Sequence, residues 1–280
     1  MKFGQIIVNN NQKTILIDSN QAKFLADPCL INLIIDWDKP DFDVDQHIEF
    51  VQPIDSLEMQ WLPPITNPGK IFCIGRNYAE HAAETGASVP EIPVVFSKFP
   101  TALTGHQSEI ILPPISQQVD FEAELVVVIG KQGRNIPLEE AMDHVFGYTC
   151  GNDISARDWQ KGRPGGQWLL GKTFDTFAPL GPTIITKDEI ANVHQLEISL
   201  ELNGNTMQHS NTKNLIFPID FLISHLSRFC TLQPGDLLFT GTPSGVGAAR
   251  KPPVYLQPED QLVVKIDGCN DLENKVVSSS

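Results

Sequence analysis

Three acidic residues alternate with apolar ones in the segment VDFEAELVVVIG, residues 119–130. Asp120, Glu122 and Glu124 fall at every second position, so on a β-strand their side chains would share one face and converge. Two ionised carboxylates about 6 Å apart repel by roughly 3 kcal/mol at an effective dielectric near 20. A shared proton or a bound cation could offset this repulsion, and an exposed strand face is the ordinary alternative.

A further carboxylate, Asp153, follows in the segment GYTCGNDISARDWQ. It could cap the next helix through backbone N–H groups, or it could join the two glutamates in a set of three carboxylates. Three hard oxygen donors suit Mg²⁺, Mn²⁺ or Ca²⁺ and leave coordination positions for water and substrate. If Asp153 joins Glu122 and Glu124 and does not cap a helix, the three carboxylates would suit a divalent cation.

The segment GRNYAEHAAETG places a histidine and a glutamate at helical spacing. Asn77 has the spacing of a capping box and Gly86 is a natural helix end, so we expect a short helix over residues 78–85. His81 and Glu84 then lie at i and i+3, where the carboxylate could orient the imidazole and leave its other nitrogen as a general base. A solvated surface pair is the ordinary alternative.

Three other segments offer groups that could bind an anion. Arg76 precedes the expected helix, Lys172 lies in WLLGKTFDTF, and Thr242 lies among the glycines of FTGTPSGVG, where backbone N–H groups can approach a ligand. Each could instead be an ordinary surface or turn residue. The sequence has no G-x-S-x-G elbow, phosphate loop or dinucleotide fingerprint, which argues against serine nucleophiles and nucleotides.

The elements that must position these residues are mostly short strands punctuated by glycine and proline. The predicted strands span residues 71–75, 93–97, 109–112, 121–129, 196–202, 236–240 and 261–266. Helices are fewer, and the best candidates lie in PLEEAMDHV and IFPIDFLISHLSRFC. The absence of regular β-α alternation favours an α+β fold, a β-rich mixed-sheet roll or sandwich.

A proline- and glycine-rich stretch, LPPITNPGK, divides the chain. We predict a small N-terminal domain, residues 1–66, and a catalytic domain, residues 67–280. The N-terminal part opens with alternating residues around the turn-forming NNNQ, which predicts a hairpin.

Composition limits the possible partners. The chain has 280 residues, 41% hydrophobic and 19% charged, and a formal net charge of −14. This negative charge and the lack of a Lys/Arg cluster exclude nucleic acid as a partner and argue against a membrane surface. The N-terminus has no leader pattern and the five cysteines show no C-x-x-C, so we expect a cytoplasmic protein with reduced thiols.

Five segments, in this order, resemble the fumarylacetoacetate hydrolase family, most closely its small domain-containing protein 2 subgroup: GRNYAEH, VDFEAELVVVIGK, NDISARDWQ, QWLLGKTFDTFAPLGP and LFTGTPSGVG. The resemblance covers roughly residues 68–280. It implies a β-rich mixed-sheet roll, a homodimer, and a site for Mg²⁺ or Mn²⁺ that Ca²⁺ could also fill in crystals. By position it implies these roles: metal ligands Glu122, Glu124 and Asp153; a water-activating dyad on a lid, His81 and Glu84; a substrate-polarising Lys172; and substrate contacts Arg76, Gln160 and Thr242.

One departure from the family pattern narrows the substrate. Larger animal members carry a fourth acid upstream of the histidine, but residues 70–79 contain none, which points to members that act on short 2-oxo acids. The leading hypothesis is a hydrolase that cleaves C–C bonds of acylpyruvate or 1,3-diketo acids through a metal-stabilised enolate. The alternatives are an oxaloacetate keto–enol tautomerase or decarboxylase, and a silent protein that binds metal and a 2-oxo acid.

Overall fold

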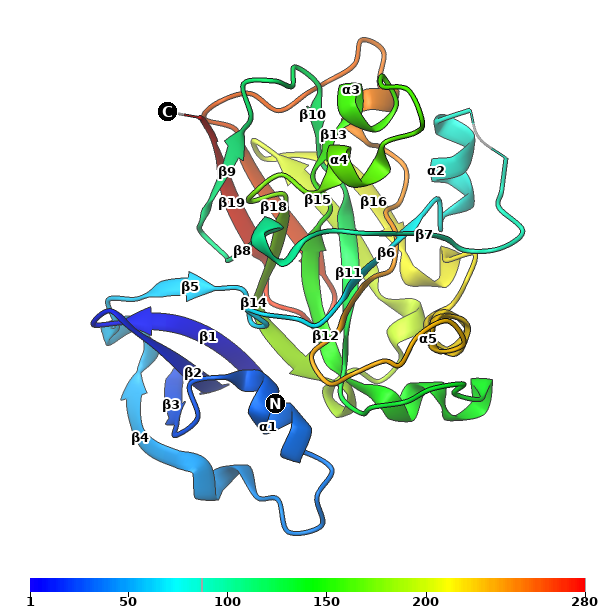
Figure 1. Cartoon of the computed structure of the whole chain (residues 1–280). Helices are drawn as coiled ribbons and strands as arrows, with labels where there is room; N and C mark the ends of the chain where they lie inside the picture. Colours follow the sequence, from blue (N-terminus) through cyan, green and yellow to red (C-terminus); the bar gives the residue numbers. More distant parts are fainter. Residues whose placement is uncertain (87, 280) are drawn as a thin grey trace.

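The computed structural model describes residues 1–86 and 88–279 and is built mainly of strands (Figure 1). Its main sheet has the spatial order β4 (Ile48–Pro53), β3 (Gln21–Leu25), β2 (Asn11–Asp18), β1 (Lys2–Val8), β14 (Ala178–Thr186), β12 (Val145–Asn152), β11 (Ala123–Ile129), β17 (Leu237–Phe239), β6 (Ile71–Gly75) and β7 (Val94–Ser97). At its margins β5 (Gln60–Leu62) pairs with β1, and β8 (Leu103–Thr104) pairs with β14.

A second sheet packs against the main one. Its order is β16 (Asn205–Asn211), β15 (Glu197–Leu202), β18 (Gln261–Ile266), β19 (Leu272–Ser278) and β9 (Glu109–Leu112), and a short ladder joins β10 (Val119–Asp120) to β13 (Ser155–Ala156). Both larger sheets are mixed, because β17 pairs with β6 and β19 pairs with β9 in parallel while most other pairs are antiparallel. This arrangement confirms the predicted β-rich α+β fold.

The helices are short and lie mostly at the margins of the sheets (Figure 1). The α-helices are α1 (Leu30–Asp36), α2 (Ala79–Glu84), α3 (Arg157–Gln160), α4 (Trp168–Lys172) and α5 (Ile219–Ser227). The 3₁₀ turns are η1 (Val44–His47), η2 (Ile54–Ser56), η3 (Pro100–Ala102), η4 (Leu138–His144), η5 (Lys187–Glu189), η6 (Val193–Gln195), η7 (Thr212–Asn214) and η8 (Gly247–Ala249). Among the described helices, none has the length and apolar character needed to cross a membrane.

Strand β11 is buried on both faces, and this explains its apolar run. Leu125 and Val127 point into the core between the two larger sheets, whereas Val126 and Val128 point into the core shared with the N-terminal strands. Glu124 lies two residues before Val126, so its side chain is on the same face of β11, and it is buried near the start of that strand. An exposed acidic strand face is therefore excluded for Glu124.

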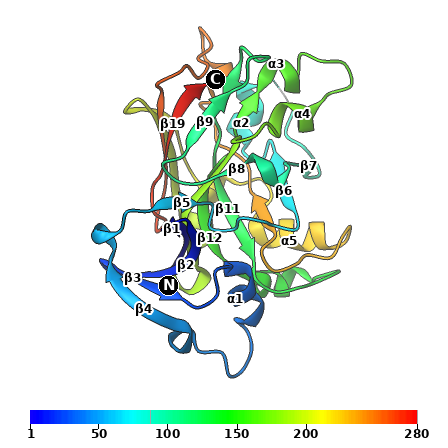
Figure 2. The ribbon, with the colours of Figure 1, turned by 60° about the vertical axis from the view of Figure 1, so that its left-hand side comes forward.

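The N-terminal strands join the main sheet through one pairing. Strands β1 and β2 form the expected hairpin, and β1 pairs with β14 so that Phe3 lies opposite Ile184 in a shared core. Figure 2 shows β1–β4 and α1 at one end of the molecule, with β9 and β19 near the other. The division at residues 1–66 and 67–280 stays a prediction.

Two local predictions were wrong. The strand expected over residues 121–129 begins only at Ala123, because the chain is not in a strand at residues 121–122, between β11 and the short strand β10, which ends at Asp120 and pairs with β13. Asn77 does not cap helix α2, whose N-cap residue is Tyr78. The buried Asn77 amide instead donates to the carbonyls of Phe217 and Thr240, a long-range contact that local spacing cannot indicate.

Candidate active site

The three predicted metal ligands meet where β11 begins and β12 ends. These strands are antiparallel, with Ala123 opposite Asn152, so the residues beside this pair become neighbours. The Asp153 N–H donates to the Glu122 carbonyl at 2.9 Å. One carboxylate oxygen from each of Glu122, Glu124 and Asp153 lies within 4.8 Å of the others, and all three side chains are buried.

Asp120 does not join this group, contrary to the expectation that the three alternating acids converge. Its carboxylate accepts hydrogen bonds from the Gly247 and Ala248 N–H groups at 2.8 and 3.1 Å. Arg157 Nε also donates to it at 2.9 Å. The interruption between β10 and β11 is the physical reason, since period-two alternation holds only within one continuous strand.

Buried cations surround the carboxylates. Lys172 Nζ lies 2.6 Å from both Glu122 Oε2 and Asp153 Oδ2, and Arg157 Nη2 lies 2.6 Å from Glu122 Oε1. Lys98 Nζ lies 2.6 Å from Asp153 Oδ1. We call the following buried residues the charged cluster: Asp120, Glu122, Glu124, Asp153, Lys98, Arg157 and Lys172.

The charged cluster contains one more acid than bases, and the excess falls on Glu124. Burial would raise the pKa of Glu122, but Arg157 and Lys172 outweigh it and lower that pKa. Burial raises the pKa of Glu124 well above its ordinary value, and the charges of Asp153 and Glu122 raise it further. Among the described residues, its carboxylate accepts one hydrogen bond, from the Gly241 N–H at 2.7 Å.

These donors fit a hard divalent cation. Asp153 Oδ1 is buried and accepts no hydrogen bond from the described residues, although it is ion-paired with Lys98. Glu124 carries the uncompensated charge, and the ligand atoms are all carboxylate oxygens, which Mg²⁺, Mn²⁺ and Ca²⁺ prefer over softer donors. The cluster therefore has both the charge and the donor type for such an ion.

His81 and Glu84 form a hydrogen-bonded pair on α2, inside the range expected for that helix. His81 Nδ1 lies 2.8 Å from Glu84 Oε1, and Glu84 Oε2 accepts a hydrogen bond from the Gly245 N–H at 2.8 Å. With Nδ1–H donated to Glu84, the imidazole Nε2 keeps its lone pair. The imidazole is buried, so a solvated surface pair is excluded.

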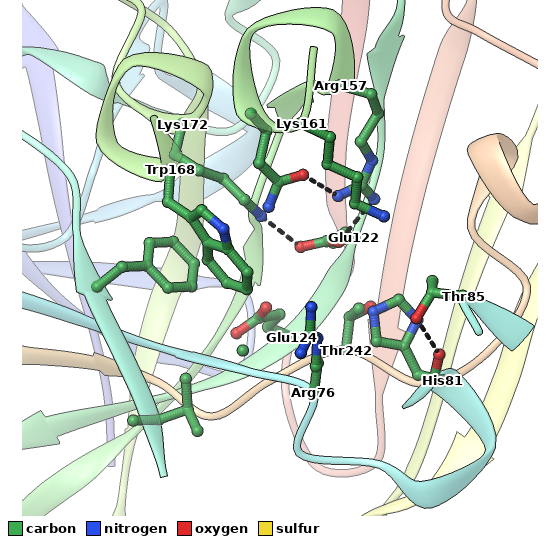
Figure 3. Close-up of a pocket in the computed structure, with 14 residues that line it drawn as sticks. Arg76, His81, Thr85, Glu122, Glu124, Arg157, Lys161, Trp168, Lys172 and Thr242 are labelled. Atoms are coloured by element: carbon green, nitrogen blue, oxygen red, sulfur yellow. Dashed lines mark hydrogen bonds and ion pairs between the residues drawn. The ribbon is translucent and has the colours of Figure 1, made fainter. Parts of the chain in front are cut away.

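A pocket connects the two groups (Figure 3). Of the predicted residues, Glu84 lies behind His81, Asp153 lies against Lys172, and the remainder line the pocket: Arg76, His81, Glu122, Glu124, Gln160, Lys172 and Thr242. Gln160 Oε1 accepts a hydrogen bond from Arg157, and Thr242 Oγ1 accepts one from Gln208. The Arg76 guanidinium lies over the Trp168 ring, 5.7 Å from its centroid.

The sequence did not indicate several residues of this site. Lys98 and Arg157 belong to the charged cluster, and Trp168 forms one wall of the pocket. A lysine inside the aromatic segment FSKFP is a signal that could have pointed to Lys98. Arg157 lies within the segment NDISARDWQ, but its partner Asp120 was expected to converge with Glu122 and Glu124.

The model of the fumarylacetoacetate (FAA) hydrolase C-terminal domain matches residues 70–277. The chain belongs to the fumarylacetoacetate hydrolase family. Among its relatives is the oxaloacetate tautomerase FAHD2A, mitochondrial, of Bos taurus, 52% identical over 220 residues that span 79% of this chain and 70% of the relative. The protein of the same name from Homo sapiens is 49% identical over the same shares.

Solved structures of the family match over the whole chain. A putative HpcE protein from Mycobacterium smegmatis has a TM-score of 0.87 at 35% identity, and the match covers 100% of both chains. A fumarylacetoacetate hydrolase from Exiguobacterium antarcticum has a TM-score of 0.86 at 31% identity, again over 100% of both chains. The proteins that match this chain therefore include one named a tautomerase and one named a hydrolase.

The prediction of a cytoplasmic protein is wrong by this comparison. Relatives from Bos taurus, Xenopus laevis, Homo sapiens and Rattus norvegicus, about half identical to this chain, are named as mitochondrial. The prediction relied on the residue pattern at the N-terminus and on the cysteine spacing, and such sequence signals are weak evidence for a compartment.

Proposed function

We propose that this protein is an oxaloacetate keto–enol tautomerase that depends on a divalent cation. The observation that carries the proposal is that one pocket is lined both by His81 of the His81–Glu84 pair and by two members, Glu122 and Glu124, of the carboxylate triad that Asp153 completes. Keto–enol interconversion needs stabilisation of an enolate oxygen and a base beside the adjacent carbon, and the pocket supplies candidates for both. Relatives about 50% identical to this chain carry this activity in their names.

Glu122, Glu124 and Asp153 would hold Mg²⁺ or Mn²⁺. When bound, such a cation supplies Lewis-acid stabilisation of the negative charge that develops on the 2-oxygen of the substrate. Lys172, already hydrogen-bonded to Glu122 and Asp153, presents its ammonium group on the same wall of the pocket and adds positive charge there.

The His81 imidazole is the candidate for the base. Its Nε2 accepts a proton from C3 of the keto form while the C–H electrons form the C2=C3 bond, and the 2-oxygen gains a proton from the imidazolium or a water molecule. Glu84 keeps the ring in the tautomer whose Nε2 is unprotonated, and the Gly245 N–H fixes Glu84. The reverse proton transfer returns the enol to the keto form.

The hydrolysis of acylpyruvates, favoured by sequence alone, would use the same groups with water as nucleophile. A matching structure from Exiguobacterium antarcticum carries the name of a fumarylacetoacetate hydrolase, at 31% identity. The relatives named as tautomerases are 52% and 49% identical to this chain, and this higher identity favours tautomerisation.

A substrate comparison tests the proposal. Purified protein with Mg²⁺ is mixed with enol-oxaloacetate and, separately, with an acylpyruvate, while enol absorbance, pyruvate and carboxylic acid products are recorded. We expect rapid ketonisation of oxaloacetate without pyruvate formation and little cleavage of the acylpyruvate. Cleavage of the acylpyruvate without ketonisation of oxaloacetate would establish the hydrolase, and pyruvate formed from oxaloacetate would indicate a decarboxylase. Inertness towards both substrates would refute the proposal.

A further inference from the structure

Lys161 brings an uncompensated positive charge to the pocket. It follows helix α3 and lines the pocket, and Figure 3 shows its ammonium end directed into the space above Glu122 and His81. Arg157 and Lys172 are also cations of this wall, but both are ion-paired within the charged cluster. Among the described residues, no carboxylate lies within ion-pair distance of Lys161.

Arg76 is a second such cation, and it projects from the other side of the same space (Figure 3). Its backbone is left-handed, with φ of 58°, and its guanidinium lies over Trp168. A non-glycine residue in this conformation is uncommon and is kept where the surroundings require it. As for Lys161, no described carboxylate pairs with it.

The crowding of these cations is unfavourable unless an anion binds between them. Burial lowers the pKa of Lys161, and the neighbouring charge of Arg157 lowers it further. Glu122 opposes this shift, and Arg76 adds a smaller lowering. The chain as a whole carries a formal charge of −14, so two unpaired cations at one pocket contrast with the negative charge of the rest of the protein. Like charges gathered at a cleft are typical of a site that attracts an anion.

A second hollow extends this positive region outward. It shares Thr85, Arg157 and Lys161 with the pocket, and Arg250 and Lys251 also line it. Lys161 therefore stands where the outer hollow meets the site, on a route by which an anion could enter.

We propose that Lys161, with Arg76 opposite, binds the substrate carboxylate that lies remote from the metal ligands, so that the site selects dianionic 2-oxo acids. This inference rests on the proposed function and deepens it, because it assigns the substrate class. A 2-oxo acid whose reactive end faces the carboxylate triad would direct its second carboxylate to the two unpaired cations. A monocarboxylate of the same length would leave both cations without a partner.

The test compares Lys161→Met with wild type on two substrates, enol-oxaloacetate and its 4-ethyl ester, which lacks the remote negative charge. We expect KM for oxaloacetate to rise by about tenfold, the loss of one charge-assisted contact, with kcat within about twofold. The ester should show unchanged constants, and Lys161→Arg should retain most of the preference. Lys131→Met, an exposed lysine at the far end of β11, serves as the control and should behave as wild type. Equal changes for both substrates, or none, would overturn the inference.

A binding measurement separates this inference from the proposed function. L-malate and L-lactate differ by the remote carboxylate and cannot enolise, so their binding to Mg²⁺-loaded protein is measured by calorimetry. Wild type should prefer malate and Lys161→Met should lose this preference, even if oxaloacetate is not turned over. Turnover of oxaloacetate with an unaltered malate preference in Lys161→Met would leave the proposed function standing and sink the role of Lys161.

Discussion

Lys98 and Asp153 form an ion pair of 2.6 Å in which both side chains are fully buried. The same ammonium group donates hydrogen bonds to the carbonyls of Ile154 and Phe177, at 3.0 and 2.7 Å, and to the carbonyl of Lys172. One cation thus holds a candidate metal ligand and the end of helix α4, which carries Lys172. We infer that Lys98 positions the charged cluster without lining the pocket.

Replacing Lys98 should make stability depend on the divalent cation. Lys98→Met breaks a buried ion pair, leaves Lys172 as the remaining cation beside Asp153, and gives the charged cluster two more acids than bases. The free energy of unfolding without metal should therefore fall by roughly 3–5 kcal/mol. Mg²⁺ should recover part of this loss, because it supplies positive charge beside Asp153. Urea unfolding with EDTA and with Mg²⁺ measures both effects.

Lys70→Met is the matched control for this experiment. Lys70 Nζ lies 2.9 Å from a carboxylate oxygen of Asp236, which is also fully buried but does not line the pocket. The variant should lose stability to a similar extent with or without Mg²⁺. The same Mg²⁺ response in both variants would contradict the role assigned to Lys98.

The His81–Glu84 pair should be needed for turnover and not for metal binding. His81→Ala should lower kcat for enol-oxaloacetate by about 10²–10⁴, the usual contribution of a positioned acid or base, while Mg²⁺ affinity stays within about twofold. His209→Ala, at a histidine whose side chain is 65% exposed, is the control and should have no effect. Unchanged turnover in His81→Ala would remove the pair from the mechanism.

The stability of the metal-free protein should depend on pH through the protonation of Glu124. Its pKa is raised in the folded state, so between its ordinary pKa and the raised one the folded protein binds more protons than the unfolded chain. The Glu124 contribution to stability is therefore fully present at low pH and is lost as pH rises through the folded-state pKa. Unfolding in EDTA from about pH 5 to 8 should show a steeper fall for wild type than for Glu124→Gln.

Saturating Mg²⁺ should remove this difference, since cation binding requires the carboxylate and displaces the proton. Parallel stability curves for wild type and Glu124→Gln in EDTA would show that Glu124 keeps an ordinary pKa.

The position of the Trp168 ring should depend on the absence of a side chain at Gly75. A Cβ on Gly75 would lie 2.6 Å from the Trp168 ring, which also contacts Phe96 edge-on at 5.4 Å and carries Arg76. Gly75→Ala should displace the indole, shift its fluorescence, raise KM for oxaloacetate and destabilise the fold by about 1–3 kcal/mol. Gly204→Ala, which strains a hairpin turn at φ +77° but meets no neighbour within 4 Å, should lower stability without changing KM. Equal KM values for the two variants would contradict the prediction that the position of Trp168, as one wall of the pocket, affects KM.

Sequence patterns predicted those parts of the site that depend on local geometry. The acidic segment correctly indicated that Glu122 and Glu124 lie together, although Glu122 precedes the first residue of β11, and the i,i+3 spacing correctly paired His81 with Glu84. The prediction for Asp120 was wrong because β10 pairs with β13 whereas β11 pairs with β12. The alternation of residue types in the sequence does not show such a change of partner strand.

The cations of the site could not be predicted in the same way. Lys98 meets Asp153 across 55 positions, and Arg157 meets Asp120 across 37, so each pairing exists only after the sheets have formed. Strands β12 and β14 were likewise missed, because both are buried throughout while their sequences include glycine, proline and polar residues. Such strands lack the alternation by which a half-buried strand is recognised.

The most direct test of the account is a titration of metal-free protein with Mn²⁺, in which the electron paramagnetic resonance signal reports the free ion. Wild type should take up a single tight equivalent. Glu80→Gln, at an exposed acid on α2, should do the same, and Glu124→Gln should bind at least about tenfold more weakly. Equal uptake by wild type and Glu124→Gln, or no uptake by wild type, would contradict the claim that Glu122, Glu124 and Asp153 hold the cation on which the chemistry depends.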